Sequence, residues 1–457
     1  MPRSAWLVLP DPFPTRVFVD SGIVDRLSER LPGALHAVLA LPVEEAREWT
    51  PRLGDVPWSL GDDYFPRDVP LWERIPRRVD LALDRGIGYY PLSVRHSLRH
   101  GFNSERMRRG HPNLFLDSAR TGALPESERL DGLVRRWLFS PRRYTSRALV
   151  EHMREECSGL VVANVQSLQA VPYLNAARRL GLPAVGYVAS WDHTVGKGIV
   201  STHVDRYLVQ NALMRDDLAR HHGIAPGRVI VTGWPQSDVF HRARPRASYE
   251  EVLGELGLDP SRGVVLVAGN TPTNAPYEGR LVQRLVAWSQ TPPAAERRPQ
   301  LLFRPHPRDR EWRARFASAV AVEGVAVQEP SYTDLEVLAV LLRYVDCVVC
   351  NAGTILLDAL VNDRPVVCVL YDEGAPPHER YAALNVTGTH YEELIASAAF
   401  LRASSFDGVT DGIERSLAAP AEFEDERQRV VREVLGVVDG RAADRVADAI
   451  VEVVSPD

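Results

Sequence analysis

The feature that most constrains this chain is a regular alternation of short apolar runs and amphipathic stretches from about residue 159 onward. Short apolar strands that alternate with helices favour parallel sheets with helices on both faces. The predicted strands are 159–164, 184–189, 206–210, 228–232, 263–269, 300–304, 323–328, 346–350 and 365–371. The predicted helices are 167–180, 211–222, 278–290, 334–343, 353–362 and 380–390.

The length of 457 residues indicates two domains, because one hydrophobic core rarely serves more than about 300 residues. The alternation breaks near 236–250, where an arginine-rich stretch interrupts it. We therefore predict two Rossmann-like α/β domains, an acceptor-side domain over 1–237 and a nucleotide-binding domain over 238–457. Residues 43–157, rich in Pro, Trp and Arg, are predicted to be an insertion in the first domain. The final stretches, 421–435 and 441–455, are predicted to form exposed amphipathic helices.

Composition narrows the class of protein. Hydrophobic residues make up 45% of the chain and charged residues 25%, which is typical of a globular protein. A net charge of −6 gives no general attraction to nucleic acid. No apolar run approaches the roughly 18 residues that a membrane span needs. The first apolar run, 5–10, is interpreted as a buried strand and not as a signal peptide, so we expect a cytoplasmic protein.

Cys347 and Cys350 form a C-x-x-C pattern that could suggest zinc or redox chemistry. They fall in a predicted strand, where a spacing of three sends the two side chains to opposite faces. No second cysteine pair completes a metal site. We therefore predict that both cysteines are small buried residues of the core.

The cationic residues are unevenly chosen, since Lys197 is the single lysine and every other cation is an arginine. Arginines cluster in 95–109, a stretch that contains five arginines and only one acidic residue, and again in 135–143. The first cluster comprises Arg95, Arg99, Arg106, Arg108 and Arg109. Either these are solvated helix faces, or they form a surface for anionic groups or for peripheral contact with the inner face of the membrane.

The turns that follow the predicted strands deserve inspection, because open parallel sheets bind ligands at the carboxyl ends of their strands. The turn after 346–350 contains Asn351, Ala352, Gly353 and Thr354, and a helix follows at once. Free backbone amides at such a helix start favour a diphosphate. Asp358, one helical turn further on, could reach a ribose hydroxyl. An ordinary helix cap would use similar residues.

The turn after 300–304 holds His306 between two prolines, which restrict the backbone and keep the imidazole in place. Arg304 and Arg308 flank it and are candidates to neutralise phosphate oxygens. A structural histidine is the alternative interpretation. Asp372, after the strand 365–371, is a candidate for contact with sugar or ribose hydroxyls, or part of a solvated loop.

The loop after 184–189 combines a carboxylate, an imidazole, a hydroxyl and the only lysine. It contains Trp191, Asp192, His193, Thr194 and Lys197. Such a group could deprotonate an acceptor hydroxyl or bind an anionic leaving group. A polar surface loop is the alternative. The turn after 228–232, with Gly233 and Asp238, is predicted to lie where the chain bends at the cleft between the domains.

These motifs, in this order, resemble GT-B transferases, nearest the CDP-glycerol glycerophosphotransferase-like and polysaccharide glycosyltransferase group. The resemblance covers roughly 160–390. It rests on Trp191, Thr194 and Lys197, on 304–307, on Gly233, Pro235 and Asp238, on 352–354, and on Arg364, Pro365, Tyr371 and Asp372. It implies a GT-B fold, a nucleotide-diphosphate donor and a hydroxyl acceptor that is lipid-linked or polymeric, with neither a metal nor a further cofactor.

Two departures from the family pattern shift the expected chemistry. Asp192 stands where the glycerophosphotransferases have a histidine, and Gly353 with Thr354 replaces their paired serines. Both favour a metal-independent glycosyltransferase of cell-envelope synthesis. Asp192 or His193 would be the base, and Lys197 with His306 would balance the diphosphate charge. The alternatives are glycerophosphate transfer, a sugar-nucleotide 2-epimerase, and a non-catalytic sugar-nucleotide binder.

Overall fold

The structure, a computed structural model, describes residues 3–65, 69–100, 127–141, 143, 145–242, 247–291 and 298–455. Contacts between residues divide the chain into two compact units. Unit 1 contains the described residues up to 100, those from 127 to 238, and 435–455. Unit 2 contains the described residues from 239 to 434. The C-terminal segment, which the sequence assigned to the second domain, thus folds with unit 1.

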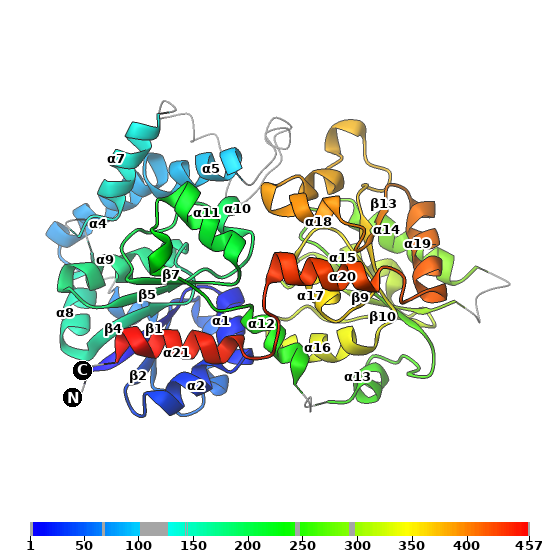
Figure 1. Cartoon of the computed structure of the whole chain (residues 1–457), viewed down its shortest axis with the longest axis horizontal. Coiled ribbons are helices and arrows are strands. Elements are labelled where there is room, and N and C mark those ends of the chain that lie inside the picture. Colours follow the sequence, from blue (N-terminus) through cyan, green and yellow to red (C-terminus); the bar gives the residue numbers. More distant parts are fainter. Residues whose placement is uncertain are drawn as a thin grey trace. The chain divides into compact units, whose positions relative to one another are not determined.

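Unit 1 is built on a sheet of seven parallel strands in the order β3-β2-β1-β4-β5-β6-β7 (Figure 1). These are β1 (Ser4–Leu9), β2 (Leu35–Leu39), β3 (Trp58–Leu60), β4 (Cys157–Val162), β5 (Ala184–Tyr187), β6 (Arg206–Val209) and β7 (Val229–Val231). Trp6 pairs with His36 on one side of β1 and with Leu160 on the other. The apolar run predicted at the start of the chain is therefore a central, buried strand.

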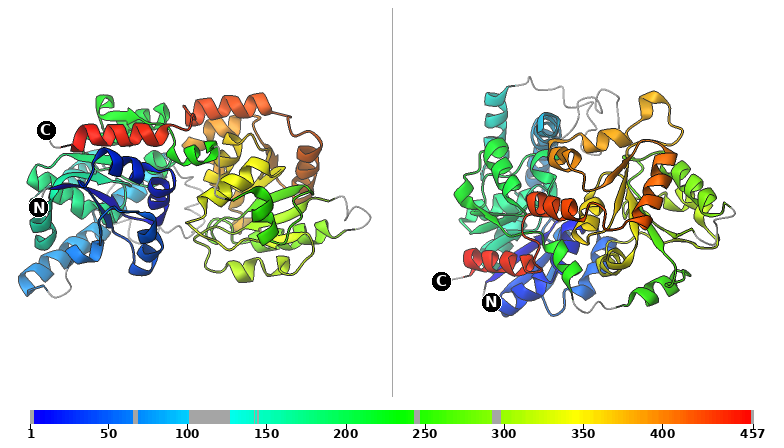
Figure 2. Two further views of the ribbon diagram at one scale, coloured as in Figure 1. Left: turned by 90° about the horizontal axis from the view of Figure 1, so that it is seen from below. Right: turned by 45° about the vertical axis from the view of Figure 1, so that its right-hand side comes forward.

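Helices cover both faces of this sheet, as parallel strands with apolar side chains require. Figure 2 shows two further views. The helices are α1 (Pro12–Asp20), α2 (Ile23–Arg30), α3 (Val43–Trp49), α4 (Leu71–Gly86), α5 (Tyr89–His100), α7 (Glu128–Leu138), α8 (Arg147–Glu156), α9 (Val171–Leu180), α10 (His193–Gly196), α11 (Ala212–His222), α12 (Pro235–Asp238) and α21 (Ala442–Val454).

Unit 2 has a sheet of six parallel strands in the order β10-β9-β8-β11-β12-β13. They are β8 (Val264–Ala268), β9 (Gln300–Arg304), β10 (Val325–Val327), β11 (Cys347–Cys350), β12 (Val366–Val369) and β13 (Leu401–Ala403). Its helices are α13 (Tyr249–Glu255), α14 (Glu278–Ser289), α15 (Trp312–Arg315), α16 (Leu335–Tyr344), α17 (Thr354–Val361), α18 (Glu392–Ala396), α19 (Phe406–Ala418) and α20 (Glu424–Val430). The predicted strands of both units are present with small shifts at their ends.

Two predicted helices differ in the structure. The stretch 380–390 forms two short 3₁₀ turns, Ala382–Val386 and Thr389–Tyr391, and no α-helix. The backbone amides of Tyr381 and Ala382 donate to the carboxylate of Asp372, which holds this segment in a loop. Helix α21, predicted to be exposed, buries Val446, Ile450 and Val454 within unit 1.

The cysteine prediction is confirmed. Cys347 and Cys350 are free thiols in β11, and both are buried. Burial raises the pKa of the Cys347 thiol to about 12, so the reactive thiolate is scarce at neutral pH. Both residues are part of the core.

Candidate functional site

The candidate donor site of unit 2 lies where the connections of its sheet change direction. From β8 the chain proceeds outward to β9 and β10, whereas β11 lies on the other side of β8 and leads to β12 and β13. Ligands of open α/β sheets bind at such a switch point, outside the carboxyl ends of the strands.

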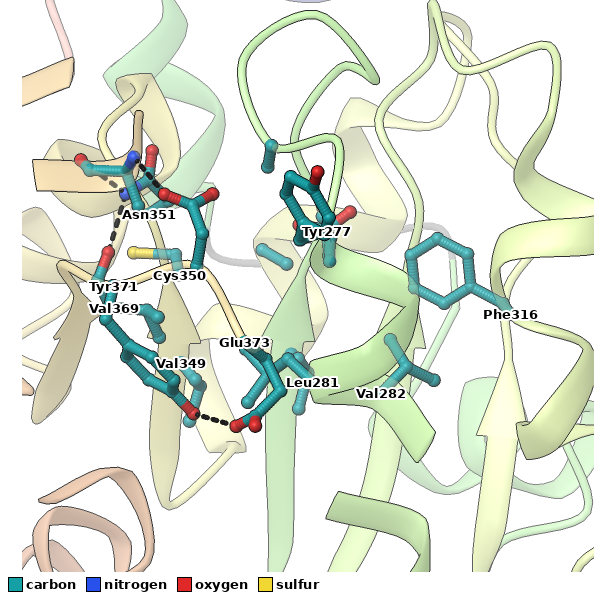
Figure 3. A pocket seen from close by; sticks show the side chains of 17 residues that line it. Tyr277, Leu281, Val282, Phe316, Val349, Cys350, Asn351, Val369, Tyr371 and Glu373 are labelled. Carbon is teal, nitrogen blue, oxygen red and sulfur yellow. Dashed lines mark hydrogen bonds between the residues drawn. The ribbon is translucent and has the colours of Figure 1, made fainter. Parts of the chain in front are cut away.

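A pocket of about 500 Å³, including the solvent space at its mouth, opens at this point. Figure 3 shows its lining, with Asn351 and Tyr371 on one side and Phe316 and Val282 on the other. Much of the lining is apolar, and the polar side chains come from the ends of β11 and β12 and from the start of α14. The pocket is lined by 267–269, Ala275, Tyr277, Glu278, Leu281, Val282, Phe316, 349–351, Val369, 371–373 and Ala382.

The turn predicted to bind phosphate joins β11 to α17. Gly353 is the cap of α17 and carries no capping side chain. The Leu356 amide donates to the Gly353 carbonyl (3.2 Å), whereas the amides of Thr354 and Ile355 precede the first i−4 carbonyl of the helix. A Cβ placed on Gly353 would meet no atom of the described residues within 4 Å. The geometry therefore leaves room for an anion at the head of this helix.

Asn351 shapes this turn from within. Its side-chain amide donates to the carbonyls of Val369 (2.6 Å) and Ala382 (3.2 Å), and its Oδ1 accepts from Asn385 (2.6 Å). The Asn270 amide donates to the carbonyl of Ala352 (3.0 Å). Asn351 lines the pocket and its polar atoms hold the turn, and its predicted contact with the donor stays a prediction.

The two carboxylates predicted to contact ribose or sugar hydroxyls are both buried. Asp358 is 2% exposed, on the face of α17 that packs inward. Asp372 lines the pocket, and its Oδ2 accepts the amides of Tyr381 (2.6 Å) and Ala382 (2.7 Å). Asp372 thus shapes the pocket wall.

Glu278, at the start of α14, is a pocket residue that the sequence analysis missed. Its Oε1 accepts the amide of Asn270 (2.8 Å), and its Oε2 pairs with Arg315 (2.8 Å). Burial raises the pKa of Glu278 to about 7, and the Arg315 guanidinium opposes that rise. A buried carboxyl that titrates near neutrality is common at functional sites. Because no motif surrounds Glu278, it is identified as a pocket residue only from the folded structure.

The three candidate residues in the turn after β9, Arg304, His306 and Arg308, have different surroundings. Arg304 is buried, and its guanidinium pairs with Asp334 (2.7 Å) and donates to Gln328 (2.5 Å). Its charge is therefore already balanced within unit 2. Arg308 is exposed, and its Nε donates to the hydroxyl of Tyr332 (2.8 Å).

His306 is held in a defined tautomer. The backbone amide of Arg308 donates to its Nδ1 (3.0 Å). Because an N–H can only donate, Nδ1 carries no proton, and the neutral ring holds its proton on Nε2. The imidazole is partly exposed, and with its proton on Nε2 that nitrogen can act only as a donor. This arrangement suits a phosphate oxygen better than it suits proton removal.

Unit 1 has its own switch point, between β1 and β4. Asp11 follows β1, and Asn164 follows β4 and donates to its carboxylate (2.9 Å). Nearby, Arg16 of α1 donates to Gln236 (2.9 Å). These polar residues were not predicted, because no recognisable spacing in the sequence links them.

The loop predicted to activate the acceptor follows β5 in the same unit. Lys197 and Asp192 form an ion pair at 3.7 Å, with both side chains partly exposed. Thr194 is buried, and its hydroxyl donates to Asp217 (2.9 Å). Trp191 is buried, and His193 is partly exposed. The structure therefore gathers the charged candidates of this loop and gives Thr194 a structural contact.

Gly233 and Asp238, predicted to lie at the cleft, receive the C-terminal helix within unit 1. The carboxylate of Asp238 accepts the first amides of α21, from Ala442 (3.2 Å) and Ala443 (2.7 Å). Gly233 has φ +87°, and a Cβ there would approach the Val437 carbonyl to 3.0 Å. Both residues are explained by packing against this segment.

The arginine clusters are only partly surface features. Arg95 is buried and paired with Asp131, and Arg143 is buried between Asp80 and Asp84. For these two residues the surface interpretation is wrong, because their charges are balanced inside the fold. Arg106, Arg108, Arg109, Arg142 and the side chain of Arg99 lie outside the described residues.

The described residues were also considered for metal binding and for membrane spans. No group of three or more His, Cys, Asp or Glu side chains in that part of the chain could hold a metal ion. No helix there has both the length and the apolar character needed to cross a membrane.

Comparison with known proteins identifies the family to which the chain belongs. The sequence model of the family described as CDP-Glycerol:Poly(glycerophosphate) glycerophosphotransferase matches residues 180–452. A search of curated proteins finds no match.

Solved structures share the architecture at low identity. A putative UDP-N-acetylglucosamine 2-epimerase from Listeria monocytogenes has a TM-score of 0.54 and 12% identity, covering 99% of this chain and 96% of that one. The UDP-GlcNAc 2-epimerase from Methanocaldococcus jannaschii has a TM-score of 0.50 and 12% identity, covering 99% and 100%. The wall teichoic acid polymerase TagF has a TM-score of 0.47 and 13% identity, covering 68% and 77%. The likeness to the two epimerases confirms the predicted GT-B fold of two parallel-sheet domains.

Proposed function

The chain belongs to the CDP-glycerol:poly(glycerophosphate) glycerophosphotransferase family, and on that premise we propose that it moves a polyol phosphate from a cytidine-diphosphate donor to a hydroxyl acceptor. The family makes it a transferase. The observation that best supports a diphosphate donor is the open space over Gly353 at the head of α17. The helix dipole and the amides at the start of the helix favour negative charge there.

The proposed reaction is a displacement at phosphorus. The acceptor oxygen bonds to the phosphorus that carries the polyol, and the bond from that phosphorus to the bridging oxygen of the diphosphate breaks. Cytidine monophosphate leaves with the bonding electrons, and the proton of the acceptor hydroxyl passes to a base. Such a reaction depends mainly on positioning and on balancing the charge of the phosphoryl oxygens.

Each unit contributes distinct groups to this proposal. In unit 2, the turn at Gly353 binds the diphosphate and Nε2–H of His306 donates to one of its oxygens. In unit 1, Asp192 or His193 accepts the acceptor proton, and Lys197 supplies positive charge beside Asp192. Metal independence stays a prediction, which activity measured in the presence of EDTA tests.

Sugar transfer on the same fold is the second candidate. It is favoured by Asp192 at the position where the glycerophosphotransferases have a histidine, and by Gly353 with Thr354 in place of paired serines. An aspartate is a common base for a sugar acceptor hydroxyl. A lipid-linked acceptor, a place in cell-envelope synthesis and contact with a membrane surface also remain proposals.

A donor panel tests the proposal. The purified chain is incubated with CDP-glycerol, CDP-ribitol, UDP-N-acetylglucosamine or dTDP-glucose, each with and without a short poly(glycerol phosphate) primer. We expect primer-dependent consumption of a CDP-polyol alone. Primer-dependent consumption of a nucleotide sugar would establish the second candidate instead. Conversion of UDP-N-acetylglucosamine without primer would indicate an epimerase.

A further inference from the structure

The loop of Asp192, His193 and Lys197 contains the short helix α10 and is also held by side chains of other elements of unit 1. Gln166 donates to the carbonyls of His193 (2.7 Å) and Gly198 (2.9 Å). Ser97 of α5 donates to the carbonyl of Gly196 (2.9 Å). Within the loop, the Gly196 amide donates to the carbonyl of Asp192 (2.7 Å) and the His193 amide to that of Ser190 (3.0 Å). A single helical turn is marginal by itself, so the outside contacts add to its stability.

His222, the last residue of α11, makes the most demanding of these contacts. Its Nε2 lies 2.7 Å from the carbonyl of Thr194, so Nε2 must donate. Its Nδ1 accepts the amide of Val200 at 3.2 Å, so Nδ1 must be unprotonated. One imidazole thus joins the two ends of the segment 194–200, which carries Lys197. Only the neutral ring with its proton on Nε2 can make both bonds.

A second imidazole supports the same carbonyl. Nε2 of His96, from α5, donates to Thr194 at 2.8 Å, and the rings of His96 and His222 lie 4.4 Å apart. His96 and His222 are 6% and 2% exposed. Two buried rings at this distance cannot both be charged without strong repulsion.

We infer that His222 is a positioning residue whose neutral imidazole, supported by His96, holds the loop of Asp192 and Lys197 in its working conformation, and that protonation of His222 releases this loop. The inference rests on the proposed function only in assigning the loop a role in catalysis. The conformational stability that His222 gives to the loop can be measured without any substrate.

The basic groups around His222 oppose a positive charge on its ring. Arg135 of α7 donates to the His222 carbonyl at 3.0 Å, and His221 lies beside it on α11. Asp217, one turn earlier, is the acid on that face, and it accepts from Thr194 and lies 3.7 Å from His221. Burial holds the pKa of His222 well below its usual 6.5, and His96 and Arg135 lower it further. The released state regains an ordinary imidazole, so acid favours release.

The single lysine makes the loop directly testable, because a lysine-specific protease can cut this chain only after Lys197. Cleavage rates of the full chain are measured from pH 8 to pH 5.5 and divided by those of a peptide spanning 190–203. We expect protection at pH 8 and a rise of about tenfold per pH unit below about 6.5, as expected for release on uptake of one proton.

Variants separate His222 from its surroundings. His222→Gln keeps a neutral donor for Thr194, and we expect its relative cleavage rate to be independent of pH. His222→Ala removes both bonds, and we expect rapid cleavage at every pH. His152→Gln, which removes an exposed histidine of α8 in the same unit, is the control and should behave like the wild type. Circular dichroism verifies that each variant is folded.

Two outcomes would overturn the inference. One is equal protection of Lys197 in His222→Ala and the wild type. The other is an unchanged pH dependence in folded His222→Gln, which would assign the acid sensitivity to another group. In active protein, the acid limb of the kcat profile should also flatten in His222→Gln while KM for the donor stays constant. If the acid limb stays unchanged in His222→Gln while the cleavage results are as expected, the proposed catalytic role of the loop is wrong. The role of His222 in holding the loop would still stand.

Discussion

Arg304 and His306 lie two residues apart in one turn, and their neighbours give them different roles. The charge of Arg304 is balanced by Asp334 within unit 2, and its contact with a phosphate stays a prediction. His306 has its Nδ1 fixed by the Arg308 amide, which leaves the proton of the neutral ring on Nε2. The same contrast separates Asn351, whose amide is engaged internally, from Gly353, which leaves open space.

Substitution of His306 tests its role as a phosphate donor. We expect His306→Ala to lower kcat by roughly 10²–10³-fold, since it removes one positioned hydrogen bond to the reacting phosphate. The dissociation constant of the donor, measured by calorimetry, should change much less. His378→Ala removes an exposed histidine of the same unit and serves as the control. A His306→Ala protein with normal kcat would remove His306 from the mechanism.

The sequence predicts which turns follow the strands and which polar residues these turns carry, because both the motifs and their positions after apolar runs are visible in it. It could not distinguish a ligand-binding side chain from one that shapes the turn, since that depends on partners distant in sequence. Asn351 meets Asn385, and Asp372 meets Tyr381 and Ala382, only after folding. Glu278 was missed for the same reason.

At the scale of elements, helices α17 and α21 begin in opposite ways. The start of α17 is capped by Gly353 without a side chain, whereas α21 begins on the carboxylate of Asp238. A helix start that is already capped by a carboxylate has its first amides satisfied. We therefore assign anion binding to α17 and a structural role to the start of α21.

Filling the space over Gly353 tests the first assignment. The backbone there is extended and an added Cβ meets no described atom within 4 Å, so Gly353→Ala should fold normally. Its methyl group would occupy anion space, and we expect donor affinity to fall about tenfold, or about 1.4 kcal/mol. Gly254→Ala, in α13 with equally open space, is the control. Unchanged donor affinity in Gly353→Ala would contradict the phosphate site.

Removing the Asp238 carboxylate tests the second assignment. Asp238→Ala leaves two buried amides of α21 unpaired, and we expect the free energy of unfolding to fall by about 1–3 kcal/mol. Chemical denaturation measures this loss, and donor affinity should be unaffected. Asp439→Ala removes an exposed ion pair with Arg445 and should cost less than about 1 kcal/mol. Equal stability losses in the two variants would argue against a cap.

At the scale of the whole chain, the alternation of strands and helices predicted β4 to β7 of the first sheet and β8 to β12 of the second, but not β2, β3 or β13. It failed for the C-terminal segment, because an amphipathic helix looks the same wherever its apolar face is buried. Helix α21 joins unit 1 through Arg26, which pairs with Asp444 at 2.7 Å across 418 positions of sequence. Local patterns cannot reveal such a distant partner.

The identity of the released nucleotide tests the central claim most directly. Polyol-phosphate transfer breaks the bridging bond of the diphosphate and releases a nucleoside monophosphate, whereas sugar transfer breaks the bond to the sugar and releases a nucleoside diphosphate. We predict that CDP-glycerol and primer yield CMP in a one-to-one ratio with phosphodiester bonds formed, as read by chromatography and ³¹P NMR. Release of a nucleoside diphosphate from a nucleotide sugar, with CDP-glycerol left intact, would contradict the account.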